Sequence, residues 1–154
     1  MTFYGFIHNL FSITISNFKK IIFVNEKATS MTKGFSIKDR LKSFVYAAKG
    51  IKYTLLTEHN FRIHIVMALI AILLGYVLKI SSLEWVSIII VIGMVFAAEI
   101  FNSSIEELTD LVSPDKNQIA GITKDLSAGA VLILAITAFI VGIIIFLPKI
   151  IELL

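Results

Sequence analysis

Residues 85–110 read WVSIIIVIGMVFAAEIFNSSIEELTD, and this segment gives the strongest indication of the fold. Its first part, up to Ala98, is apolar apart from Ser87. Its second part adds acids and an amide without a proline, so one helix is expected to continue until Ser113 and Pro114 end it. An apolar helix that ends in acids predicts a membrane span with a polar face at one end.

Composition places the whole chain in the membrane class. The 154 residues are 57% hydrophobic and 16% charged, which is too few polar residues to cover a water-soluble globule. Cysteine is absent, which excludes disulfides, cysteine-based zinc sites and thiolate nucleophiles. Three stretches approach the ~20 apolar residues that cross a hydrocarbon core. We expect an all-α integral membrane protein with spans near residues 63–80, 85–108 and 128–147.

Basic residues are concentrated before the first span. Between Ile37 and Thr57, apolar residues recur at helical spacing with lysines between them. A basic amphipathic helix of this kind usually lies on an anionic membrane surface, and the alternative is a solvated helix packed on its own protein. Lys and Arg are retained on the cytoplasmic side, so the cluster from Lys33 to Arg62 predicts a cytoplasmic N-terminus in a multi-pass protein of the cell membrane. Residues 81–84 are then expected to form an outer turn.

The first thirty residues have a different character. They are apolar and aromatic, but they lack the basic start and the cleavage site of a signal peptide. The segment Met31-Thr32-Lys33 resembles the beginning of a polypeptide chain. We therefore expect residues 1–30 to be an N-terminal extension of unknown role, or the protein to begin at Met31, and residues 31–154 to form the membrane domain.

Four polar side chains of the second span share one face. Spacings of three, four and four residues separate Glu99, Asn102, Glu106 and Asp110. At ~100° per residue these side chains occupy a stripe roughly 80° wide. Three aligned carboxylates repel one another near membrane depth, and Mg²⁺, which takes one or two carboxylates together with phosphates, is the natural compensator. The alternative is a polar face that solvates the helix end or pairs with basic residues of neighbouring helices.

Two further charged groups lie near the ends of other spans. Glu58 precedes the first span and can approach Glu106 if the first two spans are antiparallel neighbours. The alternative interpretation of Glu58 is an ordinary ion pair with Arg62, four residues later on the same helix. Lys124 stands just before the third span, where it can pair with a phosphate or serve as a plain topogenic flank.

Other common kinds of site find little support. His59 and His64 have no second ligand at metal spacing, so we expect them to be interfacial or packing residues. Neither GxxxxGK[ST] nor GxGxxG occurs in the sequence. A kinase with this sequence would therefore not use the common phosphate loops.

Three segments together resemble a known family. They are TEHNFR at residues 57–62, EIFNSSIEELTDLV at residues 99–112 and KDLSAGAV at residues 124–131. In this order they are similar to the motifs of the prokaryotic diacylglycerol kinase family, and the resemblance covers about residues 38–149. Leu83-Glu84-Trp85 and the segment 146–149 look more like the Gram-positive branch, whose members are similar to undecaprenol kinases.

The resemblance implies a homotrimeric lipid kinase that depends on ATP and Mg²⁺ and works at the cytoplasmic face. By position, Glu99 would be the general base, and Glu58 and Glu106 would hold the metal. The implied nucleotide contacts are Tyr46, Glu58, Glu106, Asp115, Lys116, Asn117, Lys124 and Asp125, with Asn102 and Asp110 in support. A further basic contact falls on Arg40 or Lys42, and the resemblance does not choose between them. The expected partners are ATP, a membrane lipid alcohol and the bilayer, with no nucleic acid.

The substrate and the class of activity each have alternatives. The resemblance to the Gram-positive branch of the family favours undecaprenol as the acceptor. The alternative acceptor is diacylglycerol, which would give phosphatidic acid. Acids in a membrane also mark ion or proton pathways, but the first and third spans have no carboxylate at mid-membrane depth. An assembly protein would need only small-residue packing, such as residues 127–130 offer, and it leaves the row of acids unexplained.

Overall fold

The computed structural model describes residues 36–115 and 117–153. These residues form four helices and no strand: α2 (Ile37–Thr57), α3 (His59–Val77), α4 (Ser82–Val112) and α5 (Gln118–Ile151). The last three are long and apolar enough to cross a membrane, so the predicted fold class is confirmed. The expected N-terminal extension and the start at Met31 lie outside the described residues, as does Lys116.

The chain divides into two compact units within α2. The first unit, Met1–Phe44, is described only from residue 36 and contains the first turns of α2. The second unit, Val45–Leu154, contains the rest of α2 and the three long helices. The bounds of α2 are those of the predicted amphipathic helix, and its apolar side chains Leu41, Phe44 and Val45 are exposed. This exposure agrees with an apolar face that meets a membrane.

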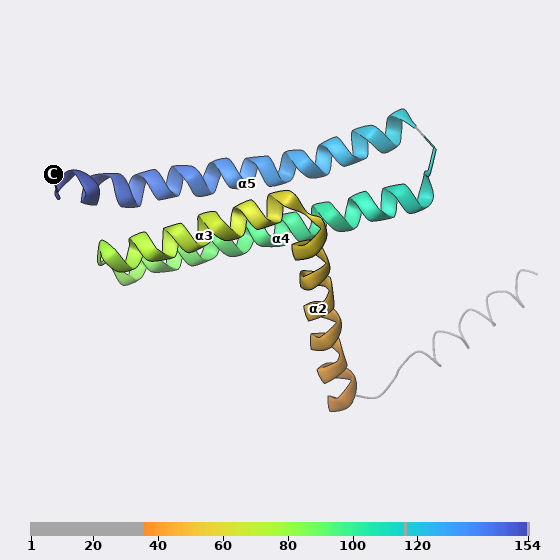
Figure 1. The fold of residues 1–154 in the computed structure, drawn as a ribbon, viewed down its shortest axis with the longest axis horizontal. Coiled ribbons are helices and arrows are strands. Elements are labelled where there is room, and N and C mark those ends of the chain that lie inside the picture. The colour runs from red at the N-terminus through yellow and green to blue at the C-terminus, as the bar shows by residue number, and fades with distance from the viewer. Residues whose placement is uncertain (1–35, 116, 154) are drawn as a thin grey trace, which may run out of the picture. The chain divides into compact units, whose positions relative to one another are not determined.

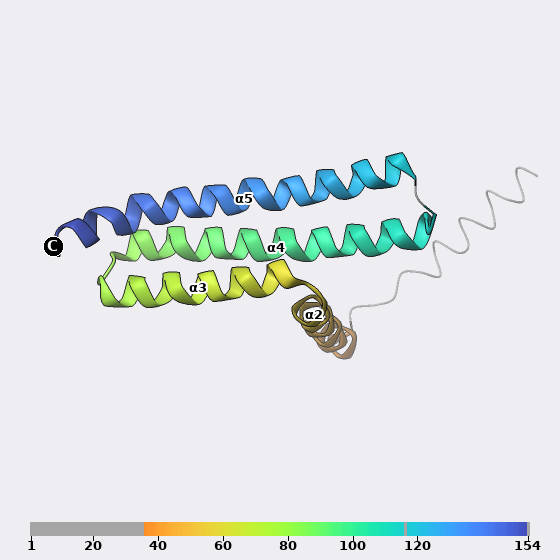
Figure 2. The same cartoon turned by 45° about the horizontal axis from the view of Figure 1, so that its top comes forward.

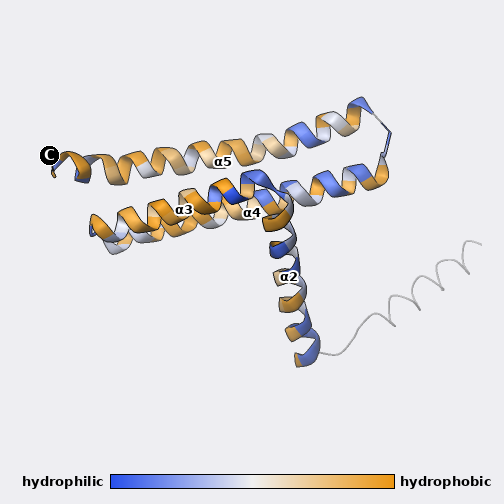
Figure 3. Ribbon diagram, in the orientation of Figure 1, coloured by the Kyte–Doolittle hydropathy of each residue, from blue (hydrophilic) through white to orange (hydrophobic). Residues whose placement is uncertain are grey.

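In the second unit, α3, α4 and α5 run side by side with alternating directions (Figures 1 and 2). α3 and α5 begin before the apolar runs predicted near 63–80 and 128–147. At 1.5 Å per residue α4 and α5 are ~46 and ~51 Å long, whereas the hydrocarbon core is ~30 Å thick. Polar residues gather at the joined ends of α4 and α5 (Figure 3). Both helices therefore continue beyond the apolar layer.

Local side-chain contacts determine where α4 and α5 begin. The Ser81 N–H donates to Glu84 Oε2 at 2.6 Å, and the Glu84 N–H donates to Ser81 Oγ at 3.4 Å, which is a capping box. The predicted turn at residues 81–84 is therefore wrong, because the capping box makes these residues the start of α4. α4 ends at Val112, as Pro114 predicts. Asn117 caps α5 by accepting a hydrogen bond from the Ile119 N–H at 2.8 Å.

The main apolar cluster lies near the turn between α3 and α4. Trp85 packs against this cluster, where α3 comes close to the start of α4. A Cβ at Gly75 would lie 2.9 Å from Ile80 Cδ1 and 3.0 Å from the Trp85 ring, so a larger residue here would force these side chains to shift. The buried members of the cluster are Ile80, Ile88, Ile145 and Phe146. This packing holds the three helices together at the end far from the row of acids.

Candidate active site

The polar row of α4 runs from a buried to an exposed position. Glu99, Asn102 and Ser103 are buried, and only 2% of Glu99 is exposed. Glu106 is half-buried, and Asp110 is exposed. Because a buried carboxylate without partners is costly, the contacts of Glu99 and Glu106 decide what this row can do.

Glu99 faces α3. Its Oε1 lies 3.1 Å from Nε2 of His64, within ion-pair distance. The same oxygen has no aligned hydrogen-bond partner in the described chain, so the two groups are close without a well-directed hydrogen bond. Buried Glu99 is thus held next to a side chain that can donate to it.

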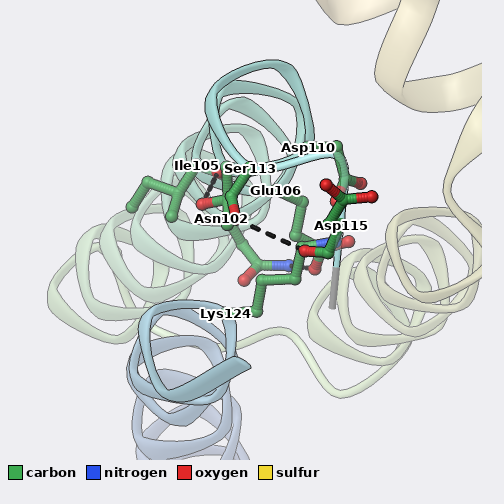
Figure 4. Close-up of polar contacts among 8 residues, drawn as sticks. Asn102, Ile105, Glu106, Asp110, Ser113, Asp115 and Lys124 are labelled. Atoms are coloured by element: carbon green, nitrogen blue, oxygen red, sulfur yellow. Dashed lines mark hydrogen bonds and ion pairs between the residues drawn. The ribbon is translucent and has the colours of Figure 1, made fainter. Parts of the chain in front are cut away.

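Glu106 is connected to α5 through Asn102. Ser127 Oγ donates to Asn102 Oδ1 at 2.6 Å, and Asn102 Nδ2 donates to Glu106 Oε1 at 2.6 Å. Ser127 Oγ also lies 2.8 Å from the backbone oxygen of Lys124. Figure 4 shows Asn102 and Glu106 near Lys124. This chain of contacts orients one Glu106 oxygen and leaves the other without a protein hydrogen bond among the described residues.

Lys124 of α5 pairs with Asp110 at the exposed end of the row. Its Nζ lies 2.6 Å from Asp110 Oδ1, and the two side chains are 33% and 65% exposed. Exposed pairs of this kind contribute little to stability because water screens their charges. Lys124 can therefore exchange Asp110 for another anion at small cost.

The loop between α4 and α5 borders the same end. A recess of about 440 Å³ is lined by Asp110, Lys124, Asp115 and Asn117, among others. The backbone oxygen of Asp115 accepts a hydrogen bond from Ser113 Oγ at 3.4 Å, which leaves the Asp115 carboxylate outside that contact. The Asn117 side chain is already engaged in capping α5. The recess thus brings several of the expected nucleotide contacts together.

Glu58 lies at the break between α2 and α3. It precedes the first turn of α3 in an extended conformation, and its side chain makes no capping hydrogen bond. Arg62 Nε donates to the Glu58 backbone oxygen at 3.3 Å, so the described structure contains no helical pair between the two charges. Glu58 and Glu106 both lie close enough to Glu99 for their charges to act on it. Three acids, two on α4 and one at the break before α3, therefore share one region.

Two other expected site residues form no hydrogen bond or ion pair with this region among the described residues. Tyr46 is exposed on α2, where Lys49 Nζ lies 5.9 Å from the centre of its ring. Asp125 is exposed on α5. No hydrogen bond or ion pair joins either side chain to the polar row in the described part of the chain.

The structure adds three residues to the site that were not predicted from the sequence. His64 faces Glu99, Ser127 donates to Asn102, and Tyr53 donates to Glu107. We expected His64 to be an interfacial or packing residue. An ionisable side chain inside an apolar span was a signal that could have marked it. Ser127 and Tyr53 gave no comparable signal.

The hydrogen bond from Tyr53 to Glu107 joins α2 to α4. This bond, with smaller contributions from burial and from the charges of Glu107 and Glu58, raises the pKa of Tyr53 above its ordinary value of 10.0. A raised pKa means that the folded protein holds the proton more tightly than the unfolded chain. The stabilisation is complete below the unfolded pKa and is lost as pH rises through the folded one.

We expect Tyr53→Phe to lower the melting temperature of the protein in detergent at about pH 8, and to lower it less at about pH 11. The difference in melting temperature should narrow because, above the ordinary pKa of 10.0, the unfolded wild-type chain releases the Tyr53 proton, which reduces the stability that the hydrogen bond contributes. Tyr76→Phe is the matched control, since Tyr76 is exposed on α3. A gap between wild type and Tyr53→Phe that is constant over this pH range would contradict the prediction.

Comparison with known proteins gives a consistent result. The model of the prokaryotic diacylglycerol kinase family matches residues 45–146. Undecaprenol kinase of Bacillus subtilis (strain 168) is 40% identical over 108 residues, which cover 70% of this chain and 88% of that protein. Diacylglycerol kinase of Helicobacter pylori (strain J99) is 33% identical over 117 residues, 75% of this chain and 90% of that protein. Diacylglycerol kinase of Escherichia coli (strain K12) is 31% identical over 100 residues, 65% of this chain and 82% of that protein.

Proposed function

The chain belongs to the prokaryotic diacylglycerol kinase family and is a lipid kinase, and we propose that it transfers the γ-phosphate of ATP to the hydroxyl group of undecaprenol. The observation that carries the proposal is the buried Glu99 carboxylate, which stands where the polar row meets the apolar layer. A lipid alcohol presents its hydroxyl group near this boundary while its tail stays in the hydrocarbon.

The proposed reaction is a direct displacement. The lipid hydroxyl oxygen forms a bond to the γ-phosphorus, and the bond from that phosphorus to the β–γ bridging oxygen breaks. ADP leaves, and the hydroxyl proton passes to the Glu99 carboxylate. Phosphoryl transfer depends mainly on positioning and charge stabilisation, so one base and a few charged groups are enough. Helices without a separate soluble domain can supply these groups.

An apolar cavity supports a lipid acceptor. It has a volume of about 530 Å³ and is bounded by side chains of α3, α4 and α5. Its lining is apolar except for His64, which touches Glu99. A hydrocarbon chain in this cavity would have its polar end beside the proposed base.

The residues present fit a magnesium ion. In the described part of the chain, no three His, Cys, Asp or Glu side chains are placed to hold a metal together. Mg²⁺ typically takes only one or two carboxylates and fills its other positions with phosphate and water oxygens. We propose Glu58 and Glu106 as these ligands, because neither carboxylate forms an ion pair among the described residues. When bound, Mg²⁺ would neutralise charge on the ATP phosphates.

The remaining site residues are proposed to bind or support the nucleotide. Lys124 would exchange Asp110 for a phosphate, and Asn102 would hold Glu106 in place. Asp110 would keep Lys124 in position between turnovers. Further nucleotide contacts are proposed for Tyr46, Asp115, Lys116, Asn117 and Asp125. Asn117 would have to bind while it caps α5, which makes it the weakest of this group.

Two features of the whole assembly are part of the proposal. The Lys and Arg cluster before the first span supports an N-terminus and an active site on the cytoplasmic side. Membership of the family supports a homotrimer. The undecaprenol kinase relative, at 40% identity against 33% and 31% for the two diacylglycerol kinases compared above, supports undecaprenol as the acceptor.

We expect the purified protein in mixed detergent and lipid to transfer labelled phosphate from Mg-ATP to undecaprenol faster than to diacylglycerol. The measurement is the radioactive product of each lipid, tested side by side at equal mole fraction. A clear preference for diacylglycerol would overturn the proposed acceptor alone. Failure of both lipids to accept phosphate would overturn the proposed reaction.

A further inference from the structure

His64 occupies an unusual place for a histidine. It lies on α3 inside an apolar span, 22% of its side chain is exposed, and its Nε2 lies 3.1 Å from Oε1 of Glu99. Only 2% of the Glu99 side chain is exposed. An ionisable group at membrane depth is costly, so it is expected to have a function and a partner.

The Glu99 carboxylate has no other polar partner in the described chain. Ser103 Oγ donates to the backbone oxygen of Glu99, at 3.0 Å, and not to its carboxylate. The Asn102 amide, one turn further along, donates to Glu106. His64 is therefore the described group that can satisfy a buried Glu99 oxygen, and leaving a buried acceptor unsatisfied is unfavourable.

Neighbouring packing keeps these two side chains together. Phe61 lies one turn before His64 on α3, and Phe96 lies one turn before Glu99 on α4. The two rings pack with centroids 5.4 Å apart and planes inclined by 59°. Phe61 is 3% exposed, so this contact is part of the buried packing between the helices. This ring contact joins α3 to α4 one turn away from the His64–Glu99 pair and helps to hold the two helices together there.

We propose that His64 is a positioning residue, which donates a hydrogen bond from Nε2 to the Glu99 carboxylate and aims the carboxylate at the lipid hydroxyl. The inference rests on the proposed function of Glu99 as the base. The distance already suits this bond, and only its alignment must improve, as catalytic hydrogen bonds do when substrate binds. His64 also lines the apolar cavity, so the bond would form where the lipid hydroxyl arrives.

The test compares side chains with and without a donor at position 64. His64→Leu and His64→Met remove the donor but suit the apolar cavity, whereas His64→Gln keeps an N–H at a similar distance from the backbone. We expect kcat for lipid phosphorylation to fall about 10²-fold in the Leu and Met variants, with KM for ATP and for lipid unchanged, because the base is misdirected. His64→Gln should recover most of kcat. His59→Leu, at an exposed position of the same helix, should behave like wild type.

The outcomes are distinguishable. If the wild type is active and both apolar variants keep kcat within about twofold, the role of His64 is overturned while the proposed function stands. An equal loss in the Gln, Leu and Met variants would also overturn it, because the shape of the ring and not its donor would then matter. A wild type that phosphorylates neither lipid would overturn the proposed function, and the role of His64 with it.

Discussion

Glu99→Gln is expected to abolish phosphoryl transfer while leaving nucleotide binding largely intact. Glutamine has nearly the same size as glutamate but cannot accept the proton of the lipid hydroxyl. Loss of a general base typically lowers kcat by about 10²- to 10⁴-fold. The measurement combines the rate of lipid phosphorylation with the affinity for Mg-ATP, determined by calorimetry. The fold should survive, because the substitution replaces one buried polar side chain, 2% exposed, by another of equal length.

The matched control for this substitution is Glu152→Gln. Glu152 is an exposed residue just beyond the C-terminal end of α5, far along the chain from the polar row. It should keep the wild-type rate and the wild-type affinity for ATP. If Glu99→Gln retained activity near the wild-type level, Glu99 could not be the base.

Glu58→Gln is expected to raise the Mg²⁺ concentration required for half-maximal activity by about tenfold or more. The Glu58 carboxylate makes no capping hydrogen bond, and Arg62 contacts its backbone oxygen instead. Removing its charge should therefore change the stability of the fold little but weaken Mg²⁺ binding strongly. Activity is measured against total Mg²⁺ at fixed ATP, and the melting temperature in detergent is measured beside it.

Glu106→Gln provides a comparison within the same proposed metal site. The amide oxygen that this substitution introduces could still accept the hydrogen bond that Asn102 donates to Glu106, so the contact with Ser127 should persist while the charge is lost. Both variants should shift the Mg²⁺ dependence in the same direction. An unchanged Mg²⁺ requirement in Glu58→Gln, with normal activity, would exclude Glu58 as a ligand.

Hydropathy predicted the number of long helices but not their ends. The apolar run begins near Ile63, whereas α3 begins at His59, because the first turn is helical but polar. α5 begins at Gln118, well before the apolar run near residue 128, because the Asn117 cap and not the membrane boundary starts that helix. A helix ends where its terminal N–H and C=O groups find other partners, and apolar runs carry no information about that.

The amino-acid sequence was sufficient to predict the class of the protein, the extent of the amphipathic helix and the face of α4 that carries Glu99, Asn102 and Glu106. These follow from composition and from helical periodicity, which act within one segment. The contacts of His64 with Glu99 and of Ser127 with Asn102 became evident from the packing of the helices alone. The physical reason is that contacts between helices depend on their register and rotation, which packing such as the Phe61–Phe96 contact sets and which no single helix encodes.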